Sequence, residues 1–341
     1  MKTAVVILNW NTREYLERFL PPLIKSCEGL DAQVVVADNA STDGSVELVK
    51  SGFPDVRCIT LDRNYGFTGG YDRALSLIDA EYFVLINSDI EVSQGWLQPL
   101  IDWMDSHSEC GACGPLLHSY QQRDSFEYAG AAGGYIDRFG YPFCRGRVLK
   151  RVEKDEGQYS TPKDVLWVSG ACLCTRSSLW KQLGGLDDRF FAHMEEIDYC
   201  WRLQLAGYRV TVVPDSTVYH LGGGTLPQDS PWKLQLNYRN NLLLLDNNLE
   251  SSIGRFRATA RITFRKCLDL GSAAVYLLTG RKEYAASVLE AHRQYRKLRV
   301  RKTGKTNISK VCGLHGICIL PMAFLKGEHI FKYLREYENR H

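Results

Sequence analysis

Four short, mostly apolar segments recur in the first 90 residues, and their repetition constrains the fold more than any other feature of this chain. They span residues 5–8, 33–37, 56–61 and 82–86. Between them lie segments with the spacing of amphipathic helices, at residues 13–27, 45–51 and 71–78. Strands that are apolar on both faces and alternate with helices predict an α/β fold with a mostly parallel, doubly wound sheet. Ligands of such sheets bind beyond the carboxyl ends of the strands.

The rest of the chain gives a coarser prediction. Residues 165–175 are typical of a further strand, and residues 177–183 of a helix closed by glycines. From Arg255 onward the chain is predicted to be helical to its end. The adjacent prolines Pro21 and Pro22 are expected to kink or divide the first helix, because proline removes a helical hydrogen bond.

Charge is distributed unevenly along the 341 residues, whose net charge is +3. Residues 251–341 hold 19 Lys and Arg against 6 Asp and Glu, whereas the first 250 residues hold 23 against 33. An acidic body with a basic tail indicates an anionic partner for the tail. The 11 cysteines are expected to remain thiols, because the chain shows no signal peptide. No apolar run reaches the roughly 18 residues of a transmembrane helix, so the expected compartment is the cytoplasm, or the inner face of the plasma membrane.

Acidic residues follow two of the apolar segments. Asp38 ends the second segment and Asp89 follows the fourth, with the glycine-rich stretch 63–70 between them. Further along the chain come three clustered acids and a histidine: Glu195, Glu196, Asp198 and His220. Acids at strand ends can hold a base, a ribose or a divalent cation, and a diphosphate needs a cation and closely approaching backbone. The set predicts a site for a nucleotide-activated donor beside a general base.

Seven motifs, in this order, resemble the family 2 inverting glycosyltransferases, and most of all their rhamnosyltransferase-like branch. The motifs are NWN (9–11), VVADNASTDGS (35–45), NYGFTGG (64–70), LINSD (85–89), WVSGAC (167–172), GGLDDRFFAHMEEIDYCWR (184–202) and VVPDSTVYHLGGG (212–224). The resemblance implies the GT-A fold of nucleotide-diphospho-sugar transferases, with a mostly parallel Rossmann-like sheet and helices on both faces. It also implies direct displacement of the nucleoside diphosphate by an acceptor hydroxyl.

The resemblance also divides the chain. Residues 1–250 would form the GT-A domain, with a nucleotide-binding half at 1–110 and an acceptor half at 111–250. Residues 251–341 would form a basic helical C-terminal extension.

Eight residues would bind the donor by this resemblance. Asp38 would accept a hydrogen bond from the imino group of the base or from the ribose, although a turn or N-cap acid suits the same segment. The others would border the nucleoside or let backbone approach the diphosphate: Asn9, Asn64, Gly66, Gly69, Gly70, Asp72 and Asn87. Because uridine and thymidine share the imino edge, the donor would be a UDP- or dTDP-sugar, and the resemblance favours dTDP-rhamnose.

A metal site is implied at the end of the fourth segment. Asn87-Ser88-Asp89 occupies the position of the family's Asp-x-Asp motif, with asparagine in place of the first acid. Asp89 is therefore the expected ligand of Mg²⁺ or Mn²⁺, hard cations that suit carboxylate and phosphate oxygens. His220 matches a family position that can also bind the metal, and a structural histidine is the alternative. The donor diphosphate would complete the coordination shell.

Glu196 is the candidate base for the acceptor hydroxyl. The family pair is usually Glu-Asp, and the longer side chain here leaves Glu195 and Asp198 as alternatives. A solvated acidic first turn of a helix would produce the same pattern. The expected acceptor-side residues, which would line the sugar pocket or shape the acceptor loop, are Trp167, Ser169, Asp187 and Asp188.

The expected acceptor is a saccharide or a lipid-linked saccharide. Residues 293–325 combine a basic and an apolar segment that could contact an anionic membrane surface, and a basic helix packed on the body is the alternative. No nucleic-acid-binding module accompanies this segment, so a nucleic-acid partner is not expected. Oligomeric state stays open.

Three other functions compete with this prediction. A nucleotidyltransferase is disfavoured because NWNTREY, and not a glycine-rich loop, follows the first segment. An NAD-dependent oxidoreductase is disfavoured because G-x-G-x-x-G is missing there. A non-catalytic nucleotide- or carbohydrate-binding protein stays open, supported by Asn87 and Glu196 at positions where the family usually has aspartate.

Overall fold

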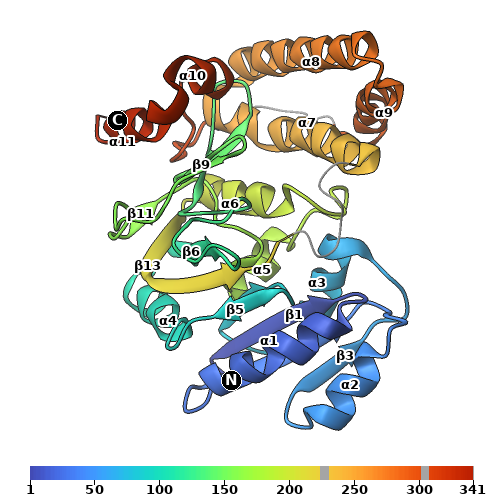
Figure 1. Cartoon of the computed structure of the whole chain (residues 1–341), viewed down its shortest axis with the longest axis vertical. Helices are drawn as coiled ribbons and strands as arrows, with labels where there is room; N and C mark the ends of the chain where they lie inside the picture. Colours follow the sequence, from blue (N-terminus) through green and yellow to red (C-terminus); the bar gives the residue numbers. More distant parts are fainter. Residues whose placement is uncertain (223–229, 301–306, 341) are drawn as a thin grey trace.

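A nine-stranded sheet forms the centre of the computed structural model, which describes residues 1–222, 230–300 and 307–340 (Figure 1). Its strands are β1 (Thr3–Asn9), β2 (Ala32–Asp38), β3 (Arg57–Thr60), β4 (Tyr82–Ile86), β5 (Ile90–Val92), β6 (Cys110–Ser119), β11 (Lys163–Asp164), β12 (Cys172–Arg176) and β13 (Arg209–His220). The order is β11-β13-β6-β12-β4-β1-β2-β3, and β5 pairs with β13. Only β5, β11 and β12 run against the direction of the other strands of this sheet, so the prediction of a mostly parallel sheet is confirmed.

Helices cover both faces of the sheet because its strands are apolar on both sides. The helices are α1 (Arg13–Ser26), α2 (Ser45–Gly52), α3 (Gly66–Ser76), α4 (Leu97–Ser106), α5 (Ser177–Leu183), α6 (Glu195–Leu205), α7 (Pro231–Ile253), α8 (Arg255–Leu278), α9 (Lys282–Leu298), α10 (Ile319–Lys326) and α11 (Ile330–Glu338), with a 3-10 turn at Gly327–His329. Along β1, Ala4 and Val6 pack into one buried cluster, and Val5 and Ile7 into the other. Helices α3, α5, α6 and α7 complete the first cluster, and α1, α2 and α4 complete the second. The predicted α/β fold class is therefore confirmed.

The topology brings polar residues to one edge of the sheet. In the register of β1 and β2, Asn9 lies opposite Asp38, and β4 runs parallel to β1 toward the same edge. β13 has the same direction and reaches this edge at His220. β5 then folds back along β13 with Ile90 opposite His220, which places Asp89 beside the histidine.

The glycine-rich segment forms the start of a helix, which the sequence analysis had placed at residues 71–78 only. Gly66, Gly69 and Gly70 lie in the first turns of α3. A Cβ on Gly70 would lie only 2.8 Å from the Leu8 side chain, so glycine allows the helix to pack this close to β1. The packing outweighs the low helix propensity of glycine.

Two other expectations on secondary structure need correction. Pro21 and Pro22 do not divide α1, since the carbonyls that they leave without a helical donor belong to exposed residues, where water can bind them. Of residues 165–175, only the part in β12 is a strand. The residues before it bond instead to the short strand Gly134–Ile136, whose Gly134 N–H donates to the Trp167 carbonyl at 2.9 Å.

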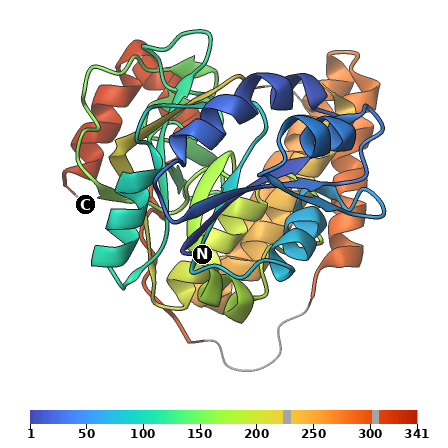
Figure 2. The ribbon, with the colours of Figure 1, turned by 90° about the horizontal axis from the view of Figure 1, so that it is seen from below.

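The C-terminal part adds long helices to the same core. α7 packs on α6, and α7, α8 and α9 pack on one another. Side chains of α10 and α11 belong to the same buried cluster as α6 and α7. Figure 2 shows α8 and α9 (orange) on one side of the molecule and α11 (red) on the other. Residues 307–318 are not helical, so the prediction of a wholly helical tail was wrong, and α7 runs across the predicted boundary at residue 250.

A small antiparallel sheet contacts the last helix, α11. Its strands are β7 (Gly134–Ile136), β8 (Pro142–Cys144), β9 (Arg147–Val148) and β10 (Arg151–Val152). Arg145, next to β8, forms an ion pair with Glu338 at the end of α11, with 3.4 Å between Arg145 Nε and Glu338 Oε2.

All 11 cysteines are free thiols, as predicted. None of the helices in the described ranges has the length and apolar character needed to cross a bilayer.

Candidate active site

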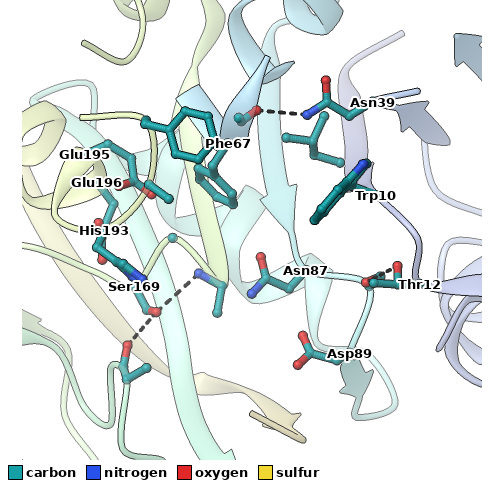
Figure 3. Close-up of a pocket in the computed structure, with 18 of the residues that line it drawn as sticks. Trp10, Thr12, Asn39, Phe67, Asn87, Asp89, Ser169, His193, Glu195 and Glu196 are labelled. Carbon is teal, nitrogen blue, oxygen red and sulfur yellow. Dashed lines mark hydrogen bonds between the residues drawn. The ribbon is translucent and has the colours of Figure 1, made fainter. Parts of the chain in front are cut away.

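A cavity of about 440 Å³ opens at the carboxyl edge of the sheet (Figure 3). Its walls come from the ends of β1 and β4, the start of α3, the segment before α6 and the first turn of α7. Eight of the residues that the sequence predicted for the site line it: Asn64, Gly66, Asn87, Asp89, Ser169, Glu195, Glu196 and His220. The fold thus gathers in one cavity residues that lie up to 156 positions apart in the chain.

Asp89 and His220 form one corner of the cavity. His220 Nε2 lies 3.2 Å from Asp89 Oδ1, and His220 Nδ1 lies 3.5 Å from Glu127 Oε1. All three residues are buried. Burial acts to lower the pKa of His220, but the two carboxylates outweigh it and raise this pKa to about 10. Burial also opposes ionisation of Asp89, yet the histidine holds the pKa of this carboxyl below its usual value.

The side chains at this corner suit a divalent cation that takes the place of the proton on His220, because an imidazole binds a metal only in its neutral form. A carboxylate oxygen and an imidazole nitrogen face each other, and a carboxylate behind a metal-binding histidine commonly fixes the imidazole ring. Glu127 is itself held, because its carboxylate accepts a hydrogen bond from Ala129 N–H. Within the described residues, no group of three or more His, Cys, Asp or Glu side chains could hold a metal ion. Oxygens of a bound diphosphate would therefore have to supply further ligands.

Trp10 and Asn39 lie on the opposite side of the cavity from Glu195 and Glu196 (Figure 3). Trp10 follows β1 and is 41% exposed, so its indole ring is available for stacking. The side chain amide of Asn39 donates to Asn64 Oδ1 and to the carbonyl of the first residue of α3, both at 3.0 Å. These bonds fix the loop that enters α3.

Five of the predicted donor-binding residues do not line the cavity: Asn9, Asp38, Gly69, Gly70 and Asp72. Asp38 is 1% exposed, and its two oxygens accept hydrogen bonds from Asn9 Nδ2 and Ser41 N–H, both at 2.8 Å. The buried carboxylate therefore fixes the turn that follows β2. Burial raises the pKa of Asp72 to about 7, and this side chain accepts a hydrogen bond from Leu186 N–H. Direct contact of these five residues with a donor stays a prediction.

Glu195 and Glu196 begin α6. The Oε2 atoms of both side chains are buried and have no hydrogen-bond partner in the described part of the chain. Burial raises the pKa of Glu196 to about 7, although backbone N–H groups at the start of α6 act against it. Burial, with the neighbouring Glu196 adding to it, raises the pKa of Glu195 well above its usual value. A carboxylate with a pKa near neutrality and an unpaired oxygen can accept a proton from a bound hydroxyl.

The segment that carries these two glutamates has an unusual backbone. Phe191, His193 and Met194 have φ values of 65°, 72° and 71°, in the left-handed region that costs roughly 1 kcal/mol or more for a non-glycine residue. Asn240 on α7 stabilises this turn, because its amide donates to the carbonyls of Ala192 and His193 at 2.7 Å. Helix α7 therefore helps to set the direction in which the two glutamates point.

Four predicted residues lie outside the cavity: the buried Trp167, Asp187, the exposed Asp188, and Asp198. Asp198 is fully buried and accepts hydrogen bonds from Arg202 Nε at 2.7 Å and Asn248 Nδ2 at 2.8 Å. It thereby links α6 to α7. Asp187 forms an ion pair with Arg189.

The sequence analysis missed the aromatic and basic residues near the glutamates: Phe191, His193, Trp232 and Lys233. The rings of Phe191 and Trp232 meet edge to face, 5.9 Å apart. Burial and the nearby Lys233 lower the pKa of His193 to about 4, so its imidazole is neutral at pH 7. Phe191 and His193 lie inside the motif at 184–202 and could have been considered. Trp232 and Lys233 lie outside all seven motifs and gave no such signal.

Comparisons with known sequences give a consistent result. A family model described as "Glycosyl transferase family 2" matches residues 4–181. The chain is 28% identical to N-acetylglucosaminyl-diphospho-decaprenol L-rhamnosyltransferase of Mycobacterium tuberculosis over 286 residues, which cover 79% of this chain and 91% of that protein. It is 23% identical to dTDP-rhamnosyl transferase RfbF of Shigella flexneri over 243 residues, which cover 67% and 76% of the two chains.

Solved structures share the fold. Mannosyltransferase PcManGT of Pyrobaculum calidifontis, in complex with GDP-Man and Mn²⁺, aligns with a TM-score of 0.54 at 13% identity and covers 86% of this chain and 87% of its own. S. aureus TarS 1–349 in complex with UDP aligns with a TM-score of 0.51 at 14% identity, and the alignment covers 90% of this chain and 94% of that one. At these identities the likeness shows the fold alone, and it agrees with the predicted GT-A fold.

Proposed function

Since the chain belongs to glycosyltransferase family 2 and is therefore an enzyme that transfers sugars, we propose that it moves a rhamnosyl unit from dTDP-rhamnose to a saccharide or lipid-linked saccharide, with inversion at the anomeric carbon. The product would enter cell-surface polysaccharide synthesis. One observation carries the proposal: the pair Asp89 and His220 and the pair Glu195 and Glu196 line the same cavity. The sugar would lie between them.

The donor is proposed from the relatives and from the cavity wall. Two relatives that align over most of this chain are named as rhamnosyltransferases, and one of them is named for dTDP-rhamnose. Trp10 would stack on the base, and Asn39 and Asn64 would hold the loop beneath the ribose and diphosphate. Asp38 would act mainly by fixing the turn that carries Asn39. A UDP-sugar remains the second donor to test.

Asp89 and His220 would hold Mg²⁺ or Mn²⁺ together with the donor diphosphate. Such a cation offsets the negative charge that develops on the leaving diphosphate. Glu127 would keep the His220 ring in place from its other nitrogen.

Glu196 would accept the proton of the acceptor hydroxyl. As that oxygen forms its bond to the anomeric carbon, the bond between this carbon and the phosphate oxygen breaks, and its electron pair stays on the diphosphate. Attack from the face opposite the leaving group inverts the configuration of the anomeric carbon. The pKa of about 7 suits a base at neutral pH, since about half of the groups are then ionised and the ionised form still binds a proton well. Glu195 is the alternative base.

A nucleotide screen tests the proposal. Thermal unfolding is followed with dTDP, UDP or GDP, each with and without Mn²⁺, and donor turnover is followed as release of dTDP from dTDP-rhamnose. At a concentration of about 100 times Kd, a ligand adds roughly 2.7 kcal/mol to the free energy of unfolding. We expect the largest stabilisation from dTDP with Mn²⁺, and slow release of dTDP. Preference for GDP would refute the donor, and binding without any turnover would indicate a non-catalytic binding protein.

The expected compartment is the cytoplasm, at the inner face of the plasma membrane. This part of the proposal is supported by the basic C-terminal region and by a relative whose named acceptor is linked to decaprenol. Separation of membrane and soluble fractions of cells that express the chain would test it.

A further inference from the structure

Helix α8 lies at one end of the molecule (Figure 1), and it exposes apolar side chains along its length. Phe256 and Leu278 are each 87% exposed, at the two ends of the helix. Between them lie four more apolar side chains that are 46% to 58% exposed: Phe264, Leu270, Val275 and Leu277. Cys267 is also exposed, and a Cβ on Gly271 would meet no atom within 4 Å. The face therefore extends along the whole helix.

The exposed part of this face is uncharged from residue 259 to residue 278. The single acid of α8, Asp269, is fully buried, where it binds Arg265 at 2.8 Å and His292 at 3.2 Å. Arg265 is buried as well and lies over the Tyr141 ring. A helix on the surface of a water-exposed protein normally turns its charged residues outward. In this part of α8 the charges point inward and the apolar side chains outward.

Basic residues flank the apolar face. Arg257 is exposed, and Arg261 and Lys266 are half-buried at its sides. Burial lowers the pKa of Arg261, and the positive charges of Arg138 and Arg257 lower it further. Burial likewise lowers the pKa of Lys266, with Arg299 adding to the effect. Like charges held this close repel one another, and a negatively charged partner would relieve the repulsion.

We propose that the outward face of α8 docks on an anionic lipid surface, with its apolar side chains at the membrane interface and its basic flanks at the head groups. Amphipathic helices bind membranes through this combination of apolar area and positive charge. A second copy of the chain is the competing occupant. A two-fold contact would bring each basic flank against its own copy, without exposed acids on α8 to pair with it. The charge therefore favours lipid.

The position of α10 agrees with a membrane on the side of the molecule where α8 lies. α8 and α10 lie at the same end of the long axis of the molecule, opposite the N-terminal strands (Figure 1). α10 exposes Phe324 and Leu325, 80% and 79%, followed by Lys326. The proposed docking surface therefore includes α8 as well as residues 293–325, which the sequence indicated as a possible membrane contact. Residues 301–306 of that segment lie outside the described ranges.

The docking surface rests on the proposed function, because a lipid-linked acceptor would be presented at such a membrane. The experiment must therefore be able to refute the docking surface without depending on whether the protein transfers a sugar. Vesicles of phosphatidylglycerol or of phosphatidylcholine are mixed with the full chain and sedimented. We expect the wild type to sediment with the anionic vesicles only. Phe256→Ser combined with Leu278→Ser should lower the partition coefficient at least roughly tenfold, since two large apolar side chains leave the interface.

Leu77→Ser is the matched control, because Leu77 is a 57% exposed leucine at the end of α3, in the N-terminal half. It should sediment like the wild type. Arg257→Gln and Arg261→Gln should each weaken binding to anionic vesicles about fivefold. In a Cys312→Ser background, which leaves Cys267 as the single exposed thiol, a polarity-sensitive dye on Cys267 should shift its emission to the blue on anionic vesicles.

Two results would overturn the docking surface. One is a wild type that stays in the supernatant, or a double variant that sediments as well as the wild type. The other is a dimer in vesicle-free solution that Phe256→Ser with Leu278→Ser converts to a monomer. Transfer to a water-soluble saccharide, measured without vesicles, should be equal in the wild type and the double variant. Vesicle binding without transfer would refute the proposed function and leave the docking surface standing.

Discussion

Replacement of Glu196 by glutamine separates the chemical role of this side chain from its effect on stability. Glu196→Gln keeps the size of the side chain and removes its charge. Burial raises the pKa of Glu196 from 4.5 to about 7, so the fold disfavours the ionised form. One pKa unit corresponds to about 1.4 kcal/mol. The ionised carboxylate therefore costs the folded state at most about 3 kcal/mol.

The sign of the effect follows from linkage. Because the pKa in the folded state lies above the unfolded value, the favourable contribution of the protonated group is complete below pH 4.5 and is lost as pH rises through about 7. Glutamine does not titrate. The variant should thus match the wild type near pH 4 and exceed its stability at pH 8 by up to about 3 kcal/mol. For 341 residues, with an unfolding entropy of about 0.7 kcal/mol/K, this is about 4 °C in Tm.

Thermal unfolding at pH 4, 6 and 8, with transfer and donor binding at pH 8, provides the assay. We expect Glu196→Gln to bind the donor nearly as well as the wild type, to lose transfer, and to gain Tm only at the higher pH values. Wild-type transfer should rise with pH and level off above about pH 7, as the base ionises. Glu195→Gln is the comparison variant. Retained turnover in Glu196→Gln, or a lower Tm at pH 8, would refute the assignment and move the base to Glu195.

Three further substitutions test the other walls of the cavity. Asp89→Ala should remove the gain in dTDP affinity that Mn²⁺ provides, as measured by calorimetry, and an unchanged gain would place the cation elsewhere. Glu127→Gln removes the carboxylate that faces His220 Nδ1 and should weaken Mn²⁺ binding roughly 10- to 100-fold. The control Glu109→Gln changes an exposed acid and should leave Mn²⁺ binding unaltered. Trp10→Ala should weaken dTDP binding roughly five- to tenfold, through lost stacking, and equal affinity would exclude the indole from the base site.

The alternation of strands and helices in the first 90 residues predicted most of what positions the cavity. Polar residues placed just after strands had to reach one edge of a parallel sheet, and Asp89 and Asn87 do so. The sequence could not show that β5 folds back on β13, because Ile90–Val92 is too short to give a periodic pattern. That pairing sets Asp89 beside His220.

The predictions from sequence that were wrong or incomplete failed because of contacts between residues that lie far apart in the chain. Local propensity places Gly66 and Gly70 in a loop, but the close approach of α3 to β1 makes them helical. The segment before α6 takes its shape from Asn240, which is distant in sequence and bonds to three of its carbonyls. Trp232 enters the cavity because α7 begins at its rim. Contacts of this kind leave no periodic pattern in the sequence.

The acidic cluster at the start of α6 is not the solvated first turn that the sequence analysis gave as the alternative, because Glu195 and Asp198 are buried. An α-helix turns by about 100° per residue, so Asp198 and Glu196, two positions apart, leave α6 on opposite sides. Glu196 lines the cavity, while Asp198 is bound by Arg202, one turn further along, and by α7. Asp198 therefore holds α6 from the side away from the cavity, and this fixes the direction of the Glu196 side chain that lines the cavity. The sequence alone offers three candidates for one role, whereas the helix geometry places Glu195 and Glu196 at the cavity and Asp198 in the support behind it.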